Sequence, residues 1–174
     1  MGPYYLTALV KALGPVQEVT GYSKKTFDKR NVENPEVNYK EINVDVDTHY
    51  FGLLKFKSGI IVDFQVTFDI WKPYDPKLEI YGDKSSLKLA DPNNYDGEIF
   101  IFDKDLYQWE LIYSSTDSQN NFYRGLGVVN MVKAIKNNTV SEDELSVPFH
   151  ILEVMCALDS YNIDSGWKKI SQQF

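Results

Sequence analysis

An alternation of apolar and polar side chains runs from Ile60 to Ile70 and constrains the fold more than any other stretch. The even positions are all apolar, whereas most of the odd positions are polar: Asp63, Gln65, Thr67 and Asp69. A period of two predicts a long strand with one face on a core and the other facing outward. The preceding HYFGLLKF predicts a second strand, and Lys57-Ser58-Gly59 between them is typical of a hairpin turn. The two segments are therefore expected to pair antiparallel.

Upstream of this hairpin, the sequence predicts a short helix, a strand and a loop. Residues 4–13 carry apolar side chains at helical spacing, and Gly14-Pro15 follows as a stop signal. VQEVTGYSKKTF then predicts a strand, and the polar stretch RNVENPEVNYK predicts an exposed loop.

Downstream, short strands are predicted by KLEIYG, SSLKLA, GEIFIF and QWELIY, each bounded by turn-forming residues. The period then changes to that of helices, first along a stripe of Val128, Met131, Val132 and Ile135. A longer helix is expected in PFHILEVMCALDSYNI, opening near Pro148. The order of elements predicts an α+β fold with a mostly antiparallel, open-faced sheet and helices packed on one face. We expect residues 1–174 to form a single domain.

Charge and cysteine content exclude several classes of function. The 174 residues carry 18 basic and 25 acidic side chains, a net charge of −7, which argues against nucleic acid or an anionic membrane as partner. The only cysteine, Cys156, lies in an apolar stretch and is expected to be a buried, reduced thiol, which favours a cytoplasmic location. No signal peptide or membrane span is predicted. With two histidines and one cysteine, a zinc or iron site built from such ligands is not expected.

Self-contained catalytic motifs are missing from the sequence. It has no glycine-rich nucleotide loop, no nucleophile elbow and no zincin motif. Acidic pairs such as Asp45 with Asp47 are interpreted as solvated surface charges rather than a glycosidase pair. His49, at a strand start, and His150, on an apolar helical face, are interpreted as structural histidines.

Three further features leave alternatives open. Trp71, after the long strand, is expected either to stack on a sugar or to pack at the sheet edge. Arg124, near a helix start, is expected to bind an anion or to form an ordinary ion pair. The polar face of the long strand is expected to face water or another subunit.

Five segments, taken in order, carry a resemblance to a known family. They are MGPYYLTALVKALGPVQEV, FKSGIIVDFQVTFDIW, LEIYGDKSSLKLADPN, YRGLGVVNMVKAI and HILEVM. Together they cover nearly the whole chain and resemble the C-terminal domain of the Gfo/Idh/MocA oxidoreductases. The resemblance implies a dihydrodipicolinate-reductase-like α+β domain, joined to an N-terminal Rossmann domain that binds NAD or NADP. It also implies homo-oligomers built through the open face of the sheet.

The resemblance further implies an acid/base residue at the start of the chain. The family pattern has an Asp, a Gly two residues on, and a His or Tyr four residues after the Asp. Gly2 and Tyr4 match, while the Asp would precede Met1. Tyr4 thus takes the place of the acid/base residue, and Tyr5 would take it if the register differs by one; two core or interface tyrosines are the alternative. Trp71, Tyr123 and Arg124 lie in segments that resemble the substrate-facing parts of the family.

The chemistry of such a site requires a proton acceptor. When a carbinol carbon gives its hydride to nicotinamide, the hydroxyl proton must also depart, so a side chain within hydrogen-bond reach accepts it. A free tyrosine titrates near pH ~10, and a nearby cation lowers its pKa. In the family that cation is a lysine of the Rossmann domain.

The sequence is therefore interpreted as the C-terminal substrate-binding and oligomerisation domain of an NAD(P)-dependent oxidoreductase. The expected substrate is a small sugar, polyol or related hydroxyl compound. The fragment is expected to be inactive alone and to bind no cofactor or metal by itself. The alternative is a non-enzymatic α+β module for assembly or carbohydrate binding.

Overall fold

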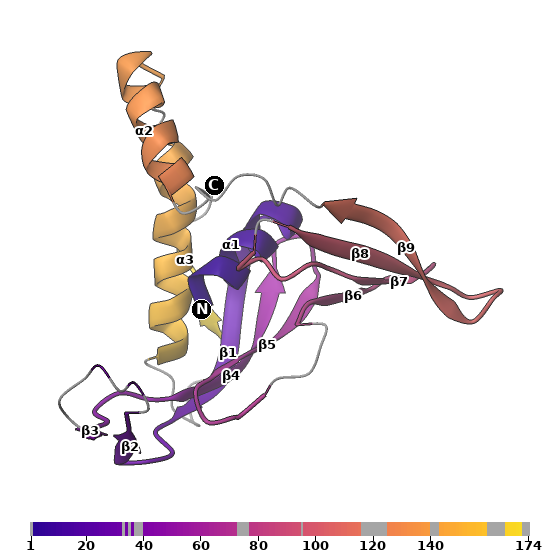
Figure 1. The fold of residues 1–174 in the computed structure, drawn as a ribbon. Coiled ribbons are helices and arrows are strands. Elements are labelled where there is room, and N and C mark those ends of the chain that lie inside the picture. Colours follow the sequence, from indigo (N-terminus) through magenta and orange to yellow (C-terminus); the bar gives the residue numbers. More distant parts are fainter. Residues whose placement is uncertain are drawn as a thin grey trace. The chain divides into compact units, whose positions relative to one another are not determined.

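The computed structural model describes residues 2–32, 34, 36, 40–72, 77–94, 96–115, 125–139, 143–159 and 166–171. It divides into two compact units, whose helices and strands are labelled in Figure 1. Unit 1 consists of Met1–Trp71 and Glu142–Phe174, and unit 2 consists of Lys72–Ser141. Helices and mainly antiparallel sheets confirm the predicted α+β class.

Unit 1 opens with helix α1, Gly2–Leu13, as the spacing of apolar residues predicts. Its inner side buries Leu6, Leu9 and Val10. The helix ends at Gly14, whose φ of 88° lies in the left-handed region and whose N–H donates to Val10 O at 3.0 Å. The following Pro15 cannot continue the helical hydrogen bonding, so the chain turns into the sheet.

The sheet of unit 1 has four antiparallel strands in the order β10-β1-β4-β5. Their bounds are Val16–Lys24 for β1, His49–Phe56 for β4, Ile61–Thr67 for β5 and Lys168–Lys169 for β10. The β4–β5 hairpin confirms the predicted pair, with Leu54 opposite Val62. Its turn needs Gly59, whose φ is 90°. The strand stops at Thr67, however, and Ile60, Phe68 and Ile70 are exposed, so the alternation extends beyond the paired segment.

Helix α3, Asp143–Asp159, packs with α1 on one face of this sheet. It buries Ile151, Val154 and Leu158, and a pair of glycines lets it approach closely. Gly21 and Gly52 face each other in the register of β1 and β4, and a Cβ on Gly52 would lie 3.0 Å from Leu158 Cδ2 and 2.6 Å from Thr20 O. The sheet backbone is thus in direct contact with the helix.

Two predictions about α3 are wrong. The helix begins at Asp143, so Pro148 lies inside it rather than at its opening. Cys156 is exposed rather than buried. The buried positions His150, Ile151, Val154 and Leu158 recur at helical spacing on one face, and residue 156 lies about 200° around the helix from Val154.

An arm, defined here as residues 25–48, leaves the sheet between β1 and β4. Within it, β2 (Lys29–Asn31) pairs antiparallel with β3 (Glu41–Asn43), with Arg30 opposite Ile42. The loop predicted for residues 30–40 is therefore wrong at its start, where Arg30 and Asn31 belong to β2, and β3 begins directly after its end. Sequence reasoning missed the ladder because neither strand shows a period of two with one buried face; both are almost wholly exposed.

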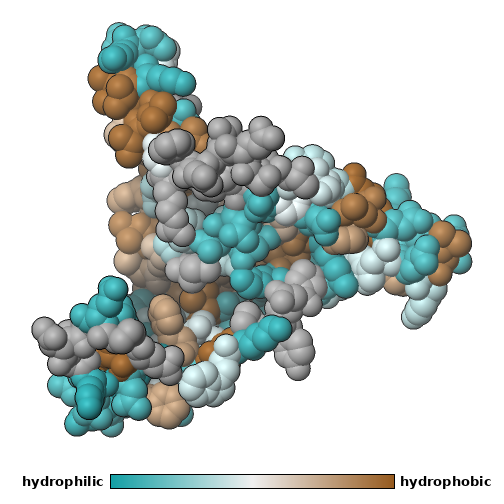
Figure 2. Space-filling view, viewed as in Figure 1, coloured by the Kyte–Doolittle hydropathy of each residue, from teal (hydrophilic) through white to brown (hydrophobic). Residues whose placement is uncertain are grey.

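Unit 2 contains a second antiparallel sheet in the order β6-β7-β8-β9. The bounds are Glu79–Tyr81, Ser86–Lys88, Gly97–Asp103 and Gln108–Ser115, which confirms the four predicted strands. Phe102 contacts Tyr107 and Trp109 edge to face, with ring centroids 5.3 and 5.4 Å apart. Helix α2, Leu126–Lys136, confirms the predicted helix, but its apolar stripe is exposed and forms a hydrophobic patch in Figure 2.

Candidate functional site

The first turn of α1 presents two tyrosines on different sides of the helix. Tyr4 is 49% exposed, whereas Tyr5 is half-buried. Tyr5 lies one helical turn before the buried Leu9, while Tyr4 lies one turn before the half-buried Ala8. Of the two, Tyr4 has the more accessible phenol for a ligand from outside this chain.

The beginning of α1 lies against the distal part of β5. A Cβ placed on Gly2 would be 4.0 Å from Val66 Cγ2. β5 ends one residue later, and the chain reaches Trp71 after four more residues. The start of α1 and the end of β5 therefore belong to the same region of unit 1.

Trp71 is 98% exposed. The alternative that it packs at the sheet edge therefore does not describe this side chain. An indole with both faces open is suited to stacking on the C–H face of a sugar ring. Tyr123 and Arg124 lie outside the described residues.

A polar network around Asp69 adjoins this region, and sequence reasoning missed it. The side chain of Asp69 is 8% exposed, although its odd position predicted a face open to water or to a subunit. Its Oδ2 accepts hydrogen bonds from Thr26 Oγ1 at 2.5 Å and Thr48 Oγ1 at 2.8 Å. Burial raises the pKa of Asp69, but these hydrogen bonds and the nearby Arg30 charge outweigh it, so the pKa lies below its ordinary value. No sequence motif marks the network, because Thr26 and Thr48 flank the arm.

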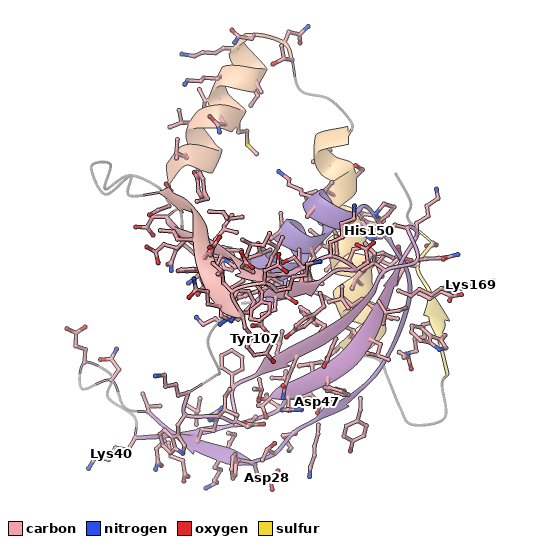
Figure 3. All side chains as sticks on the ribbon, turned by 90° about the vertical axis from the view of Figure 1, so that its right-hand side faces the viewer. Asp28, Lys40, Asp47, Tyr107, His150 and Lys169 are labelled. Carbon is pink, nitrogen blue, oxygen red and sulfur yellow. The ribbon has the colours of Figure 1, made fainter. Side chains whose placement is uncertain are left out.

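The remaining charged candidates have simpler environments. His150 is fully buried, and its Nε2 accepts a hydrogen bond from Val16 N–H at 2.9 Å, which confirms the structural interpretation (Figure 3). His49 is half-buried at the start of β4. Asp45 is exposed and Asp47 is half-buried.

A shallow hollow of about 270 Å³ is lined by Gln17, Lys57, Lys169 and Ile170. It lies at the end of the sheet where Val16 pairs with Phe56, opposite to the end where His49 pairs with Thr67. Its position therefore separates it from Tyr4 and Asp69.

The described part of the chain offers neither a metal-binding cluster nor a helix that could span a membrane. Among the described residues, no group of three His, Cys, Asp or Glu side chains is arranged to hold a metal ion. No helix in the described ranges is both long and apolar enough to cross a membrane.

Sequence comparison identifies the family. The sequence model of the GFO/IDH/MocA C-terminal domain family matches residues 1–88, which include α1, the whole arm and the β4–β5 hairpin. The chain belongs to the GFO/IDH/MocA family. No curated protein sequence matches it.

Solved structures share the fold of this GFO/IDH/MocA chain. Levoglucosan dehydrogenase in its apo form has a TM-score of 0.73 at 12% identity, over 100% of this chain and 51% of that one. The complex of levoglucosan dehydrogenase with NADH and L-sorbose has a TM-score of 0.69 at 14% identity, over 99% of this chain and 50% of that one. An oxidoreductase domain protein from Kribbella flavida has a TM-score of 0.62 at 20% identity, over 98% of this chain and 50% of that one. The chain thus spans about half the length of each of these structures.

Proposed function

We propose that this chain is the C-terminal substrate-binding and oligomerisation half of an NAD(P)-dependent oxidoreductase that acts on a sugar, polyol or related hydroxyl compound. Membership of the GFO/IDH/MocA family carries this proposal. The fold shared with about half of a levoglucosan dehydrogenase, one structure of which holds NADH and L-sorbose, supports it. The missing partner is then an N-terminal Rossmann domain.

The cofactor belongs to that other half. The described strands of this chain pair only antiparallel, so they form no parallel βαβ unit of the kind that holds a dinucleotide. The described residues therefore do not fit NAD(P) by themselves. This chain alone is accordingly proposed to be inactive and to bind NAD(H) negligibly.

Tyr4 is proposed as the acid/base residue, in the place that the family pattern gives it. Its exposed phenol lies at the start of α1, where it is accessible to a substrate held between the halves. As phenolate, Tyr4 would accept the hydroxyl proton of the substrate during oxidation and return it during reduction. Because a free phenol titrates near pH ~10, this role requires a cation from the other half.

Trp71 and Tyr5 are proposed as substrate contacts, as are Tyr123 and Arg124. Trp71 has the clearest support, since its indole is exposed beside a fixed backbone. In the sheet, Tyr22 and Phe51 are opposite each other on the face away from α1 and α3, 43% and 46% exposed. This apolar content supports assembly of homo-oligomers through the open face. A Phe51→Glu chain that keeps the parent's oligomeric mass in light scattering would contradict that assembly.

The deciding experiment is the size of the natural polypeptide. An antibody raised to this chain would capture the endogenous protein for intact mass and N-terminal peptide sequencing. A product longer by another domain of ~150 residues, with an Asp before Met1, is the expected result. Tyr4→Phe in that protein should then lower kcat by about 100-fold or more. A natural chain that begins at Met1 would instead favour the non-enzymatic module.

A further inference from the structure

A single buried carboxylate closes the base of the arm. Thr26 lies just inside the start of the arm and Thr48 is its last residue, and both hydroxyls donate to the same oxygen of Asp69. Thr26 N–H also donates to Thr48 Oγ1 at 3.3 Å. The places where the chain enters and leaves the arm are thus joined to each other and to the segment that follows β5.

Arg30 adds a second link, from within the arm to the same segment. Its Nη2 donates to Phe68 O at 2.6 Å, and its Nη1 lies 3.6 Å from Asp69 Oδ1. That Oδ1 is buried and accepts no hydrogen bond from the described residues. The guanidinium therefore provides the nearest compensating charge for an otherwise unpaired oxygen.

The backbone of residues 67–69 is held on several sides. Phe68 N–H donates to Thr48 O at 2.9 Å, and Asp69 N–H donates to Thr67 Oγ1 at 3.0 Å. Two residues further on, Trp71 is almost fully exposed and can take little orientation from packing. The hydrogen-bonded backbone of residues 67–69 is the nearest anchored part of the chain before it.

We infer that Asp69 is a positioning residue that acts through Trp71, holding the indole where a sugar-like hydroxyl compound stacks. The inference rests on the proposed function, because Trp71 is assigned there as a substrate contact. A carboxylate loses hydration when it is buried, and here the two threonine hydroxyls and the Arg30 guanidinium compensate for that loss, so the network fastens the arm to the segment that leads to Trp71. Restricting the backbone that carries the indole, in turn, reduces the conformational entropy lost when substrate binds.

Another ion pair of the arm lies at the surface and not in a buried network. Lys25 and Asp28 form an ion pair at 2.7 Å, but the Asp28 side chain is 87% exposed (Figure 3). Exposed pairs of this kind contribute little to stability. Asp28→Asn therefore serves as a matched control, since it removes a carboxylate charge from the same arm without touching Asp69.

The test follows the motion of Trp71 itself. Trp109→Phe and Trp167→Phe leave Trp71 as the only tryptophan, whose fluorescence anisotropy decay reports its local rotation. Asp69→Asn should enlarge the fast component of that decay, and Asp28→Asn should leave it unchanged. If Trp71 already rotates freely in the parent, or if a folded Asp69→Asn chain leaves the decay unchanged, the inference is overturned.

A milder pair of variants covers the case in which Asp69→Asn does not fold. Thr26→Val keeps the size of the side chain but removes one donor to Asp69, whereas Thr26→Ser keeps the donor. Greater Trp71 motion in the valine variant with recovery in the serine variant is the expected result. Equal decays in both variants would contradict the role of the network.

The full-length protein separates this inference from the proposed function. There, Asp69→Asn should raise KM for the sugar-like substrate by about tenfold and leave kcat within about twofold. An equal loss in kcat with unchanged KM would contradict positioning. Should the full-length protein lack oxidoreductase activity, the proposed function fails while the anisotropy result still decides whether Asp69 holds Trp71.

Discussion

The two units of the chain differ sharply in how they bury side chains. Within the described ranges, every fully buried residue belongs to unit 1, including Leu54, Phe56 and Val154. Unit 2 has a sheet of the same strand number, yet its described side chains are at most half-buried. Two helices cover one face of the first sheet, and this difference shows that strand pairing alone does not create a core.

Stability should therefore be concentrated in unit 1. Its sheet and helices exclude water from aliphatic and aromatic side chains, which is the dominant favourable contribution to folding. Unit 2 relies on strand hydrogen bonds and on surface contacts such as the cluster around Phe102. Substitutions that probe each unit test this contrast directly.

The largest effect is expected for Gly52→Ala. The new Cβ would lie 2.6 Å from Thr20 O and 3.0 Å from Leu158 Cδ2, so both the β1 strand and α3 must move. We expect a loss of about 3 kcal/mol in the free energy of unfolding, measured by urea titration. Gly127→Ala, on exposed α2 with open space around it, is the control and should add about 0.5 to 1 kcal/mol. Equal effects at the two glycines would refute the close approach.

A somewhat smaller loss is expected for His150→Leu. The leucine keeps an apolar volume but removes the acceptor of the buried Val16 N–H. An unsatisfied buried donor costs about 2 kcal/mol, visible as a lower urea midpoint with an unchanged slope. His49→Leu, at a half-buried strand start, should lower the midpoint much less. A neutral result at His150 would show that the Val16 N–H finds another partner.

Much of this architecture can be predicted from residue pattern, and the exceptions have physical causes. The β4–β5 hairpin follows from local alternation and turn chemistry, and α1 from apolar spacing with Gly14. The burial of Asp69 depends on two threonines 21 and 43 residues away, which no local pattern reveals. The prediction that Cys156 is buried is wrong because an apolar stretch does not reveal which face of the helix meets the sheet.

The candidate site is predictable to a lesser degree. The family resemblance supplied Tyr4, and the place of Trp71 after the long strand already made it a candidate for stacking on a sugar, while the residues alone carried no catalytic motif. The structure then shows that Tyr4 is more exposed than Tyr5, a difference that the sequence does not reveal because it depends on which side of α1 is covered. The acid/base and substrate-binding roles stay predictions, because they depend on groups that the other half would contribute.

A pH-dependent effect is expected for Tyr50→Phe, also in unit 1. Burial, the hydrogen bond from Tyr50 OH to Asp159 Oδ1 at 2.5 Å and the nearby negative charges raise the pKa of Tyr50 above its ordinary value. The stabilisation from neutral Tyr50 is thus fully present below pH ~10 and is lost as pH rises toward the folded-state pKa. Phenylalanine should lower stability by about 1 kcal/mol at pH 7 and flatten the alkaline decline. An alkaline decline as steep as the parent's would contradict this assignment.

The smallest effect is expected for Lys88→Ala in unit 2. Lys88 Nζ lies 4.1 Å from the centroid of the Trp109 ring, and a contact of this type between half-buried side chains contributes about 0.5 to 1 kcal/mol. Because unit 2 has no fully buried side chain among its described residues, the loss should appear as faster amide hydrogen exchange in β7 and β8, with β1 and β4 unchanged. Lys84→Ala, an exposed turn residue, is the matched control. Faster exchange in β1 and β4 as well would mean that the two units unfold together. The units would then differ in how much side-chain surface they bury but not in their stability.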